Sequence, residues 1–107
     1  MVAKKPSKNV DDLCQALLLL KNPGEMYSFL KDLCTPQEME ALAERWHVCQ
    51  LLHRGNLSYR EIRQMTGSSL TTIGRIARFL KDEDYHGYRS LLEKINNVDK
   101  NREEGKK

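Results

Sequence analysis

Residues 60–80 read REIRQMTGSSLTTIGRIARFL, two short amphipathic segments separated by Gly67. In a helix-turn-helix, a short first helix ends near a glycine in the left-handed conformation, and a second helix crosses it at a steep angle. Counted from the residue before this stretch, Ile62 is fourth, the glycine ninth, Leu70 twelfth and Ile73 fifteenth. These positions must pack two such helices together, so the stretch predicts a helix-turn-helix.

Capping signals define the starts of two helices in this part of the chain. Thr35 with Glu38, and Ser58 with Glu61, are Ser/Thr-x-x-Glu pairs, the pattern of a capping box. A proline follows Thr35 and occupies the first helical position, where its missing N–H costs nothing. The helix that starts there is expected to be the longest and to end at Gly55.

Apolar residues at three-to-four spacing predict further helices over 10–18, 26–33 and 85–95, and a serine at 68 or 69 precedes the second helix of the pair. No alternating strand pattern competes with them, so an all-α chain of about six helices is expected. The polar ends favour disorder. The expected parts are an N-terminal tail (1–9), one all-α domain (10–96) and a C-terminal tail (97–107).

Length and composition limit what this chain forms alone. It has 107 residues, 39% hydrophobic and 31% charged, which suits one domain with a thin core that a partner copy would complete. Val10, Leu17, Leu18, Phe29, Leu30 and Trp46 supply apolar surface, and the last five are expected at or near a shared dimer core. No apolar run approaches the roughly 18–20 residues of a membrane span, and MVAKKPSKNV lacks a signal peptide's apolar stretch. A cytoplasmic, nucleoid-associated protein is expected.

The cysteines predict neither a disulfide framework nor a metal site. Cys14, Cys34 and Cys49 are odd in number, widely separated and set among apolar residues, as expected of reduced, buried thiols. No C-x-x-C pair exists, and His47 and Cys49 point in different directions on a helix. We therefore expect no metal at Cys34, His47, Cys49 and His53, and no cofactor.

Positive charge is concentrated around the predicted helix-turn-helix. Residues 54–81 hold six basic side chains and one acid, a net +5, so the remainder carries −2 because the whole chain carries +3. A basic stretch beside a mildly acidic remainder is the pattern of a nucleic-acid binder. The alternative is an ordinary solvated helical face.

The residue types left on the outer side of the two helices suit a DNA groove. Small residues at the start of the second helix let its backbone approach a major groove, and threonine offers both a hydroxyl and a thymine-contacting methyl group. Flanking arginines reach phosphates or a guanine edge. The outer residues are Arg60, Arg63, Gln64, Ser69, Thr71, Thr72, Arg75 and Arg78.

Two longer stretches carry a family resemblance. LCTPQEMEALAERWHVCQLLHRGNLSYREIRQMTGSSLTTIGRIARFL (33–80) resembles the Trp repressor family, and DLCQALLLLKNPGEMYSFLKDLC (12–34) resembles its YerC/YecD branch. The likeness covers roughly residues 10–95. It implies a bacterial, six-helix, all-α chain that intertwines with a second copy and presents two recognition helices to a palindromic operator in double-stranded DNA.

The resemblance assigns DNA-contacting roles residue by residue. The family's base-contacting positions fall on Leu70, Thr71 and Thr72. Arg60 matches an arginine that reaches a guanine, and Arg63 replaces a lysine that contacts DNA.

The resemblance also assigns a ligand pocket, from which this sequence departs. Two arginines that sandwich an indole in the family match Arg45 and Arg75, and Thr35 matches the threonine near the ligand carboxylate. A glycine and a serine of tryptophan-binding members are replaced by Ile76 and Phe79, which are expected to project into the space between the arginines. Control by tryptophan is therefore not expected. The two arginines are left with two alternatives: salt bridges with acids such as Glu44 or Glu38, or a different small-molecule effector.

Taken together, the sequence predicts a sequence-specific DNA-binding transcriptional regulator, a repressor that acts as a homodimer. The rival interpretation is a helical protein–protein interaction module that does not read DNA. Catalysis is not expected, because the chain has no nucleophile elbow, no phosphate-cradling glycine loop and no paired carboxylates in an apolar setting.

Overall fold

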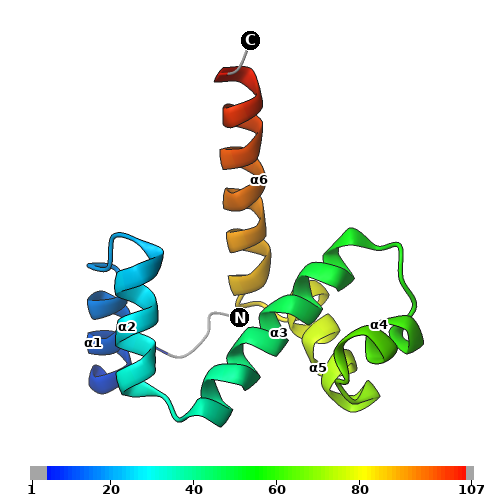
Figure 1. The fold of residues 1–107 in the computed structure, drawn as a ribbon, viewed down its shortest axis with the longest axis horizontal. Coiled ribbons are helices and arrows are strands. Elements are labelled where there is room, and N and C mark those ends of the chain that lie inside the picture. Colours follow the sequence, from blue (N-terminus) through cyan, green and yellow to red (C-terminus); the bar gives the residue numbers. More distant parts are fainter. Residues whose placement is uncertain (1–4, 106–107) are drawn as a thin grey trace. The chain divides into compact units, whose positions relative to one another are not determined.

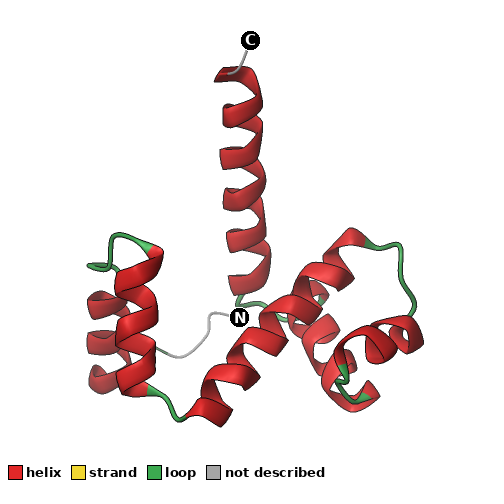
Figure 2. Cartoon of the chain, viewed as in Figure 1, coloured by secondary structure: helices red, strands yellow, loops and turns green. Residues whose placement is uncertain are grey.

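The chain is all-α over residues 5–105, which the computed structural model describes; residues 1–4 and 106–107 of the expected tails lie outside the described residues. No strand occurs in this described range, and short loops join the helices (Figure 1, Figure 2). The six expected helices are confirmed. They are α1 (Lys8–Leu17), α2 (Pro23–Leu33), α3 (Pro36–Arg54), α4 (Tyr59–Thr66), α5 (Leu70–Lys81) and α6 (Gly87–Gly105).

Both predicted capping boxes are present. At the start of α3, Glu38 N–H donates to Thr35 Oγ1 (3.1 Å), and Thr35 N–H donates to the Glu38 carboxylate (2.9 Å). At the start of α4, the corresponding bonds join Ser58 and Glu61 at 3.1 Å and 3.0 Å. These backbone N–H bonds stabilise the ionised carboxylates, so the pKa of Glu38 and that of Glu61 are both lowered.

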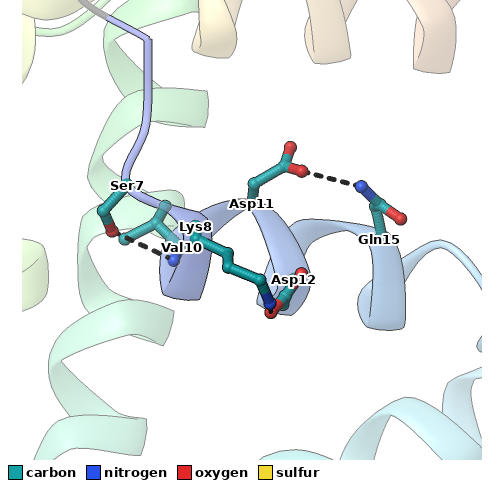
Figure 3. Close-up of polar contacts among 6 residues, drawn as sticks. All are labelled: Ser7, Lys8, Val10, Asp11, Asp12 and Gln15. Carbon is teal, nitrogen blue, oxygen red and sulfur yellow. Dashed lines mark hydrogen bonds and ion pairs between the residues drawn. The ribbon is translucent and has the colours of Figure 1, made fainter.

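The chain divides into two compact units, an N-terminal unit (Met1–Ala43) and a helix-turn-helix unit (Glu44–Lys107). In the N-terminal unit, Ser7 caps α1 by accepting from Val10 N–H at 3.3 Å. Lys8 pairs with Asp12 at 2.8 Å one turn along the same helix (Figure 3). Asn22 caps α2 by accepting from Glu25 N–H at 2.9 Å. The helices of this unit are therefore specified by local contacts.

The N-terminal unit lacks buried side chains: between residues 5 and 43, every side chain is exposed or half-buried. Leu18 is 84% exposed and Leu19 76%, whereas Leu17, Phe29 and Leu30 are half-buried. Covering these exposed leucines with another apolar surface would lower the free energy, because apolar surface would leave water.

The helix-turn-helix unit has its own hydrophobic core. Ile62 of α4 and Ile73 of α5 are both fully buried, as predicted, and Trp46 is partly buried against the core. α4 packs against α5, and α5 packs against α6 (Figure 1). The buried residues are Val48, Cys49, Leu51, Leu52, Ile62, Ile73, Ile76, Ala77, Leu80 and Leu92.

Leu70, which was expected to help pack the two helices together, is 46% exposed. Leu70 is the first residue of α5, where the chain has just left the turn and the core lies deeper along the helix. Apolar periodicity alone does not separate such end positions from core positions.

The last helix begins later and extends further than predicted. His86, with a φ of 58°, precedes it, and α6 then runs from Gly87 to Gly105. The stretch from Asn96 to Glu104 contains neither proline nor glycine, so nothing in it terminates a helix. None of the helices in the described range is long and apolar enough to cross a membrane.

Candidate nucleic-acid interface

The predicted turn between α4 and α5 is present with its glycine in the left-handed conformation. Gly67 has a φ of 80°, and its N–H donates to the carbonyl of Arg63 at 2.8 Å, closing α4. A residue with a Cβ is strained at this φ, which explains glycine at the predicted position. Below the turn, Thr66 Oγ1 donates to the carbonyl of Ile62 (2.8 Å) and accepts from Ser68 N–H (3.1 Å).

All seven predicted DNA-contacting residues lie on α4, the turn or α5 of the helix-turn-helix unit. Every one of them is exposed except Thr72, which is half-buried. The set comprises Arg60 and Arg63 on α4, Ser69 as the N-cap of α5, and Leu70, Thr71, Thr72 and Arg78 on α5.

The start of α5 holds its small polar side chains in a fixed arrangement. Ser69 Oγ accepts from Thr72 N–H at 3.1 Å and donates to Thr72 Oγ1 at 3.0 Å. Because Thr72 Oγ1 is the acceptor in that contact, its own proton is left for another acceptor. The unpaired N–H groups of the first turn also give this end of α5 a partial positive charge. A polyanion is attracted to the positive end of the helix, and the Thr72 hydroxyl can donate to an acceptor on a base edge.

Arg78, near the other end of α5, has two neighbours that sequence reasoning missed or did not connect to it. Its Nε lies 3.2 Å from the carboxylate of Glu83, and its guanidinium carbon lies 5.2 Å from the centre of the Phe79 ring. Glu83 lies only two residues after the end of α5, in a turn and not in a helix. No periodicity rule covers that pairing.

The contacts of Arg89 on α6 were not predicted from the sequence either. Its Nη2 donates to the carbonyls of Leu80 (3.2 Å) and Lys81 (3.0 Å), the last two residues of α5. These carbonyls have no partner inside the helix. Arg89 therefore ties the C-terminal end of α5 to α6. A contact between residues eight and nine apart across a turn leaves no local sequence signal.

A hollow of about 510 Å³ adjoins α5 within the helix-turn-helix unit. Arg45 and Arg75, the arginines matched to the family's ligand pocket, both line it. Thr35, the third matched position, caps α3 and belongs to the N-terminal unit. The lining is Arg45, Thr72, Arg75, Ile76, Phe79, Tyr85, Gly87 and Tyr88, with no acidic side chain among them.

The two substituted residues, Ile76 and Phe79, both line this hollow. Ile76 is 3% exposed and packs into the core, because its side chain has apolar neighbours on that side. Phe79 lies over the guanidinium of Arg75, with 4.9 Å from the guanidinium carbon to the ring centre. Its ring also stacks with that of Tyr85 at 6.3 Å. One guanidinium face is thus already covered by an aromatic ring of the protein itself.

Tyr88 also lines the hollow, and its ring centre lies 6.5 Å from that of Trp46. The pKa of Tyr88 is raised, first by burial and then by the nearby Cys49, while Arg45 and Arg75 act in the opposite direction. Burial raises the pKa of the Cys49 thiol to about 11, so it is uncharged at neutral pH.

The cysteines are free, but they are not all buried as expected. Cys49 is buried, Cys34 is half-buried at the end of α2, and Cys14 is exposed on α1. Cys14 lies in the unit without buried side chains, which is why its apolar surroundings do not cover it. Within the described chain, no three His, Cys, Asp or Glu side chains gather as a group able to hold a metal ion.

Several known proteins are similar to this chain. The family described as "Trp repressor protein" matches residues 8–96. The chain is 40% identical over 79 residues to the "Uncharacterized protein YerC" of Bacillus subtilis, covering 74% of this chain and 75% of that one. It is 38% identical over 78 residues to a "Trp operon repressor homolog" of Aliivibrio salmonicida, covering 70% and 72%.

Solved structures agree. A TrpR-like protein from Eubacterium eligens superposes with a TM-score of 0.76 at 36% identity, covering 84% of this chain and 91% of that one. A putative Trp repressor from Staphylococcus aureus gives 0.76 at 33% identity, covering 85% and 89%. The chain therefore belongs to the Trp repressor family.

Proposed function

We propose that this protein is a sequence-specific DNA-binding transcriptional regulator, a repressor, that binds a palindromic operator in double-stranded DNA. The observation that carries the proposal is the outer face of α4 and α5, where Arg60, Arg63 and Arg78 flank the small residues that begin α5. Membership of a regulator family supports it, and the same membership argues against catalysis.

The residues divide into two roles in this proposal. Arg60 and Arg63 on α4, together with Arg78 on α5, anchor the protein on phosphates, and Arg60 also reaches a guanine edge. Leu70 and Thr71 are exposed at the first turn of α5, and Thr72 has a free hydroxyl proton. These three read bases, with Ser69 close to the backbone.

The protein acts as a homodimer in this proposal, because a palindromic site needs two recognition helices related by a two-fold axis. The exposed leucines of the N-terminal unit supply the apolar surface for a second copy. Residues 10–96 then form one domain completed by the partner, and α6 continues beyond this range to Gly105. We further propose that it works in the cytoplasm, associated with the nucleoid.

Tryptophan does not control this protein in our proposal. Phe79 already covers one face of Arg75, and none of the residues lining the hollow is an acid that would pair with an ammonium group. Two arginines without an acid suit an anionic ligand better than a zwitterion. Whether such an effector exists does not affect the DNA-binding proposal.

The test is selection of bound duplexes from a random DNA pool, followed by titration of the selected duplex at several salt concentrations. We expect a palindromic consensus. If a dimer neutralises about six to ten phosphates, affinity falls roughly a thousandfold or more between 50 and 200 mM salt. Enrichment of no sequence, with affinity insensitive to salt, would instead support the interaction-module alternative.

A matched pair of variants locates the interface. Arg63→Ala should weaken binding to selected and random duplexes alike and reduce the salt slope by about one per subunit. Lys94→Ala removes the same charge from an exposed position on α6 and should leave both unchanged. Equal losses in the two variants would show that net charge, rather than the α4 face, determines binding.

A further inference from the structure

The candidate interface contains an arginine whose charge is partly neutralised by its own chain. Arg78 Nε lies 3.2 Å from Glu83 Oε1, with the two side chains 56% and 37% exposed. Arg60 and Arg63 have no carboxylate within ion-pair distance in the part of the chain that the structure describes. Arg78 is therefore the exception among the three arginines.

The backbone places Glu83 beside Arg78. The carbonyl of Arg78 accepts from the N–H of Asp82 at 2.8 Å and from the N–H of Glu83 at 3.1 Å. The chain turns back at the end of α5, so the Glu83 side chain starts close to the Arg78 side chain. Less conformational freedom is lost in forming this pair than in forming one between distant surface residues.

An aromatic surface limits where the Arg78 guanidinium lies. Its carbon is 5.2 Å from the centre of the Phe79 ring, and that ring is itself held by stacking on Tyr85. A cation is attracted to an aromatic face at this distance. Glu83 and Phe79 together hold Arg78 along the protein surface.

We propose that Glu83 is an autoinhibitory residue that competes with DNA phosphate for Arg78 and so limits the affinity of this protein for DNA. The inference rests on the proposed DNA-binding function. A phosphate oxygen and a carboxylate oxygen use the same guanidinium donors, so Arg78 engages the DNA backbone only as its contact with Glu83 loosens. Glu83 also adds a negative charge next to a surface that meets a polyanion.

The size of the effect follows from the exposure of the pair. Exposed ion pairs shift an equilibrium by roughly twofold to fivefold. Both recognition helices of a dimer carry the contact, so its removal should tighten binding about fourfold to twenty-fivefold. If Arg78 then gains a phosphate contact in each subunit, the slope of log affinity against log salt should steepen by about two.

The experiment is a double-mutant cycle on the full chain, measured by fluorescence anisotropy with the duplex recovered by selection. The variants are Glu83→Gln, Arg78→Ala and both together, with Asp82→Asn as the matched control. Asp82 is one residue away and exposed, and its change to Asn removes the same charge. Its backbone N–H bonds to the Arg78 carbonyl, but the described ion pairs join the Arg78 guanidinium to Glu83 and not to Asp82. Thermal melts check that each variant is folded.

We expect Glu83→Gln to tighten binding and steepen the salt slope, and Arg78→Ala to abolish that gain. An equal gain in Asp82→Asn, or a gain that persists without Arg78, would show a general charge effect and overturn the proposal. Weaker binding by Glu83→Gln would overturn it too, because Glu83 would then orient Arg78 for DNA. If the unmodified protein binds no duplex at all, the proposed function fails first.

Discussion

The two units of this chain differ in what they do with their apolar residues. In the helix-turn-helix unit, Ile62 and Ile73 are fully buried and Leu51 is 2% exposed, so the unit folds around its own core. In the N-terminal unit, Leu18 and Leu19 are 84% and 76% exposed, and the polar contacts near its start run within one helix (Figure 3). Local sequence signals therefore form the helices of both units, whereas only the helix-turn-helix unit buries its large apolar side chains within the described chain.

The largest expected effect comes from adding a charge to the N-terminal unit. If a second copy covers Leu18, then Leu18→Glu loses about 1.5–3 kcal/mol of burial per subunit, doubled in the dimer, and adds the cost of burying a charge. We expect the dimer to dissociate at micromolar concentration and the melting temperature to fall by more than ten degrees. Analytical ultracentrifugation and thermal melts measure both.

Met65→Glu is the control for this comparison. Met65 is 59% exposed on α4 in the unit with its own core, so the same new charge should change stability by no more than about 0.5 kcal/mol. If both variants change the melting temperature equally little and the unmodified protein sediments as a folded monomer, the exposed leucines of the N-terminal unit do not stabilise a dimer.

A second effect separates specific binding from the fold. Thr72→Ala removes the hydroxyl that accepts from Ser69 Oγ and leaves the backbone bond from Thr72 N–H to Ser69 in place. We expect a loss of about 1–3 kcal/mol on the selected duplex and much less on random DNA. Competition titrations with both duplexes measure the difference, and equal losses on both would mean that Thr72 does not read sequence.

The helix-turn-helix unit could be predicted well because its signals are local. The capping box at Ser58, the glycine at 67 and the spacing of Ile62 and Ile73 each lie within one or two helical turns of the structure they specify. The family resemblance was readable from the same stretch and is confirmed.

Contacts that join one helix to the turn or helix that follows it were not predicted. Arg89 reaches back to the end of α5, and Glu83 pairs across a turn, so neither leaves a periodic pattern. Ile76 lines the hollow but is only 3% exposed and belongs to the buried core, which its match to the family's pocket did not indicate. The contact partners of a side chain beyond its own helix are set by packing, which a single sequence does not encode in its spacing.

A third and smaller effect compares the two capping boxes. The N-cap change Ser58→Ala should cost about 0.5–2 kcal/mol of stability. Glu61 has a pKa lowered from its usual 4.5 because the Ser58 backbone N–H and side chain hydrogen-bond to it. Its contribution is present above its unfolded pKa and is lost as pH falls through the lower, folded pKa. Melts between pH 6 and pH 2 should therefore show an acid loss that Glu61→Gln reduces.

Glu38→Gln repeats the measurement in the N-terminal unit, where the pKa of Glu38 is lowered in the same way by Thr35. If the two units unfold as one cooperative body, both variants change the acid side of a single transition. Two transitions, each sensitive to one variant, would show that the units unfold separately.

The smallest expected effect is the absence of a response to tryptophan. An indole that stacked on the face of Arg75 that Phe79 covers would have to displace that ring, whose centre lies 4.9 Å from the guanidinium carbon and which stacks on Tyr85. The remaining hollow of about 510 Å³ has room for a ligand, so the argument rests on its chemistry rather than its volume. A ligand at a hundred times its dissociation constant raises stability by about 2.7 kcal/mol, which would shift the melting temperature by roughly ten degrees or more. Thermal melts with and without millimolar tryptophan should therefore coincide.

The double variant Ile76→Gly with Phe79→Ser uncovers Arg75 and should lose a few kcal/mol of stability, because Ile76 is buried in the core. A clear upward shift in the unmodified protein would mean that Phe79 yields to the indole, and that the self-stacked arginine is no barrier to the ligand.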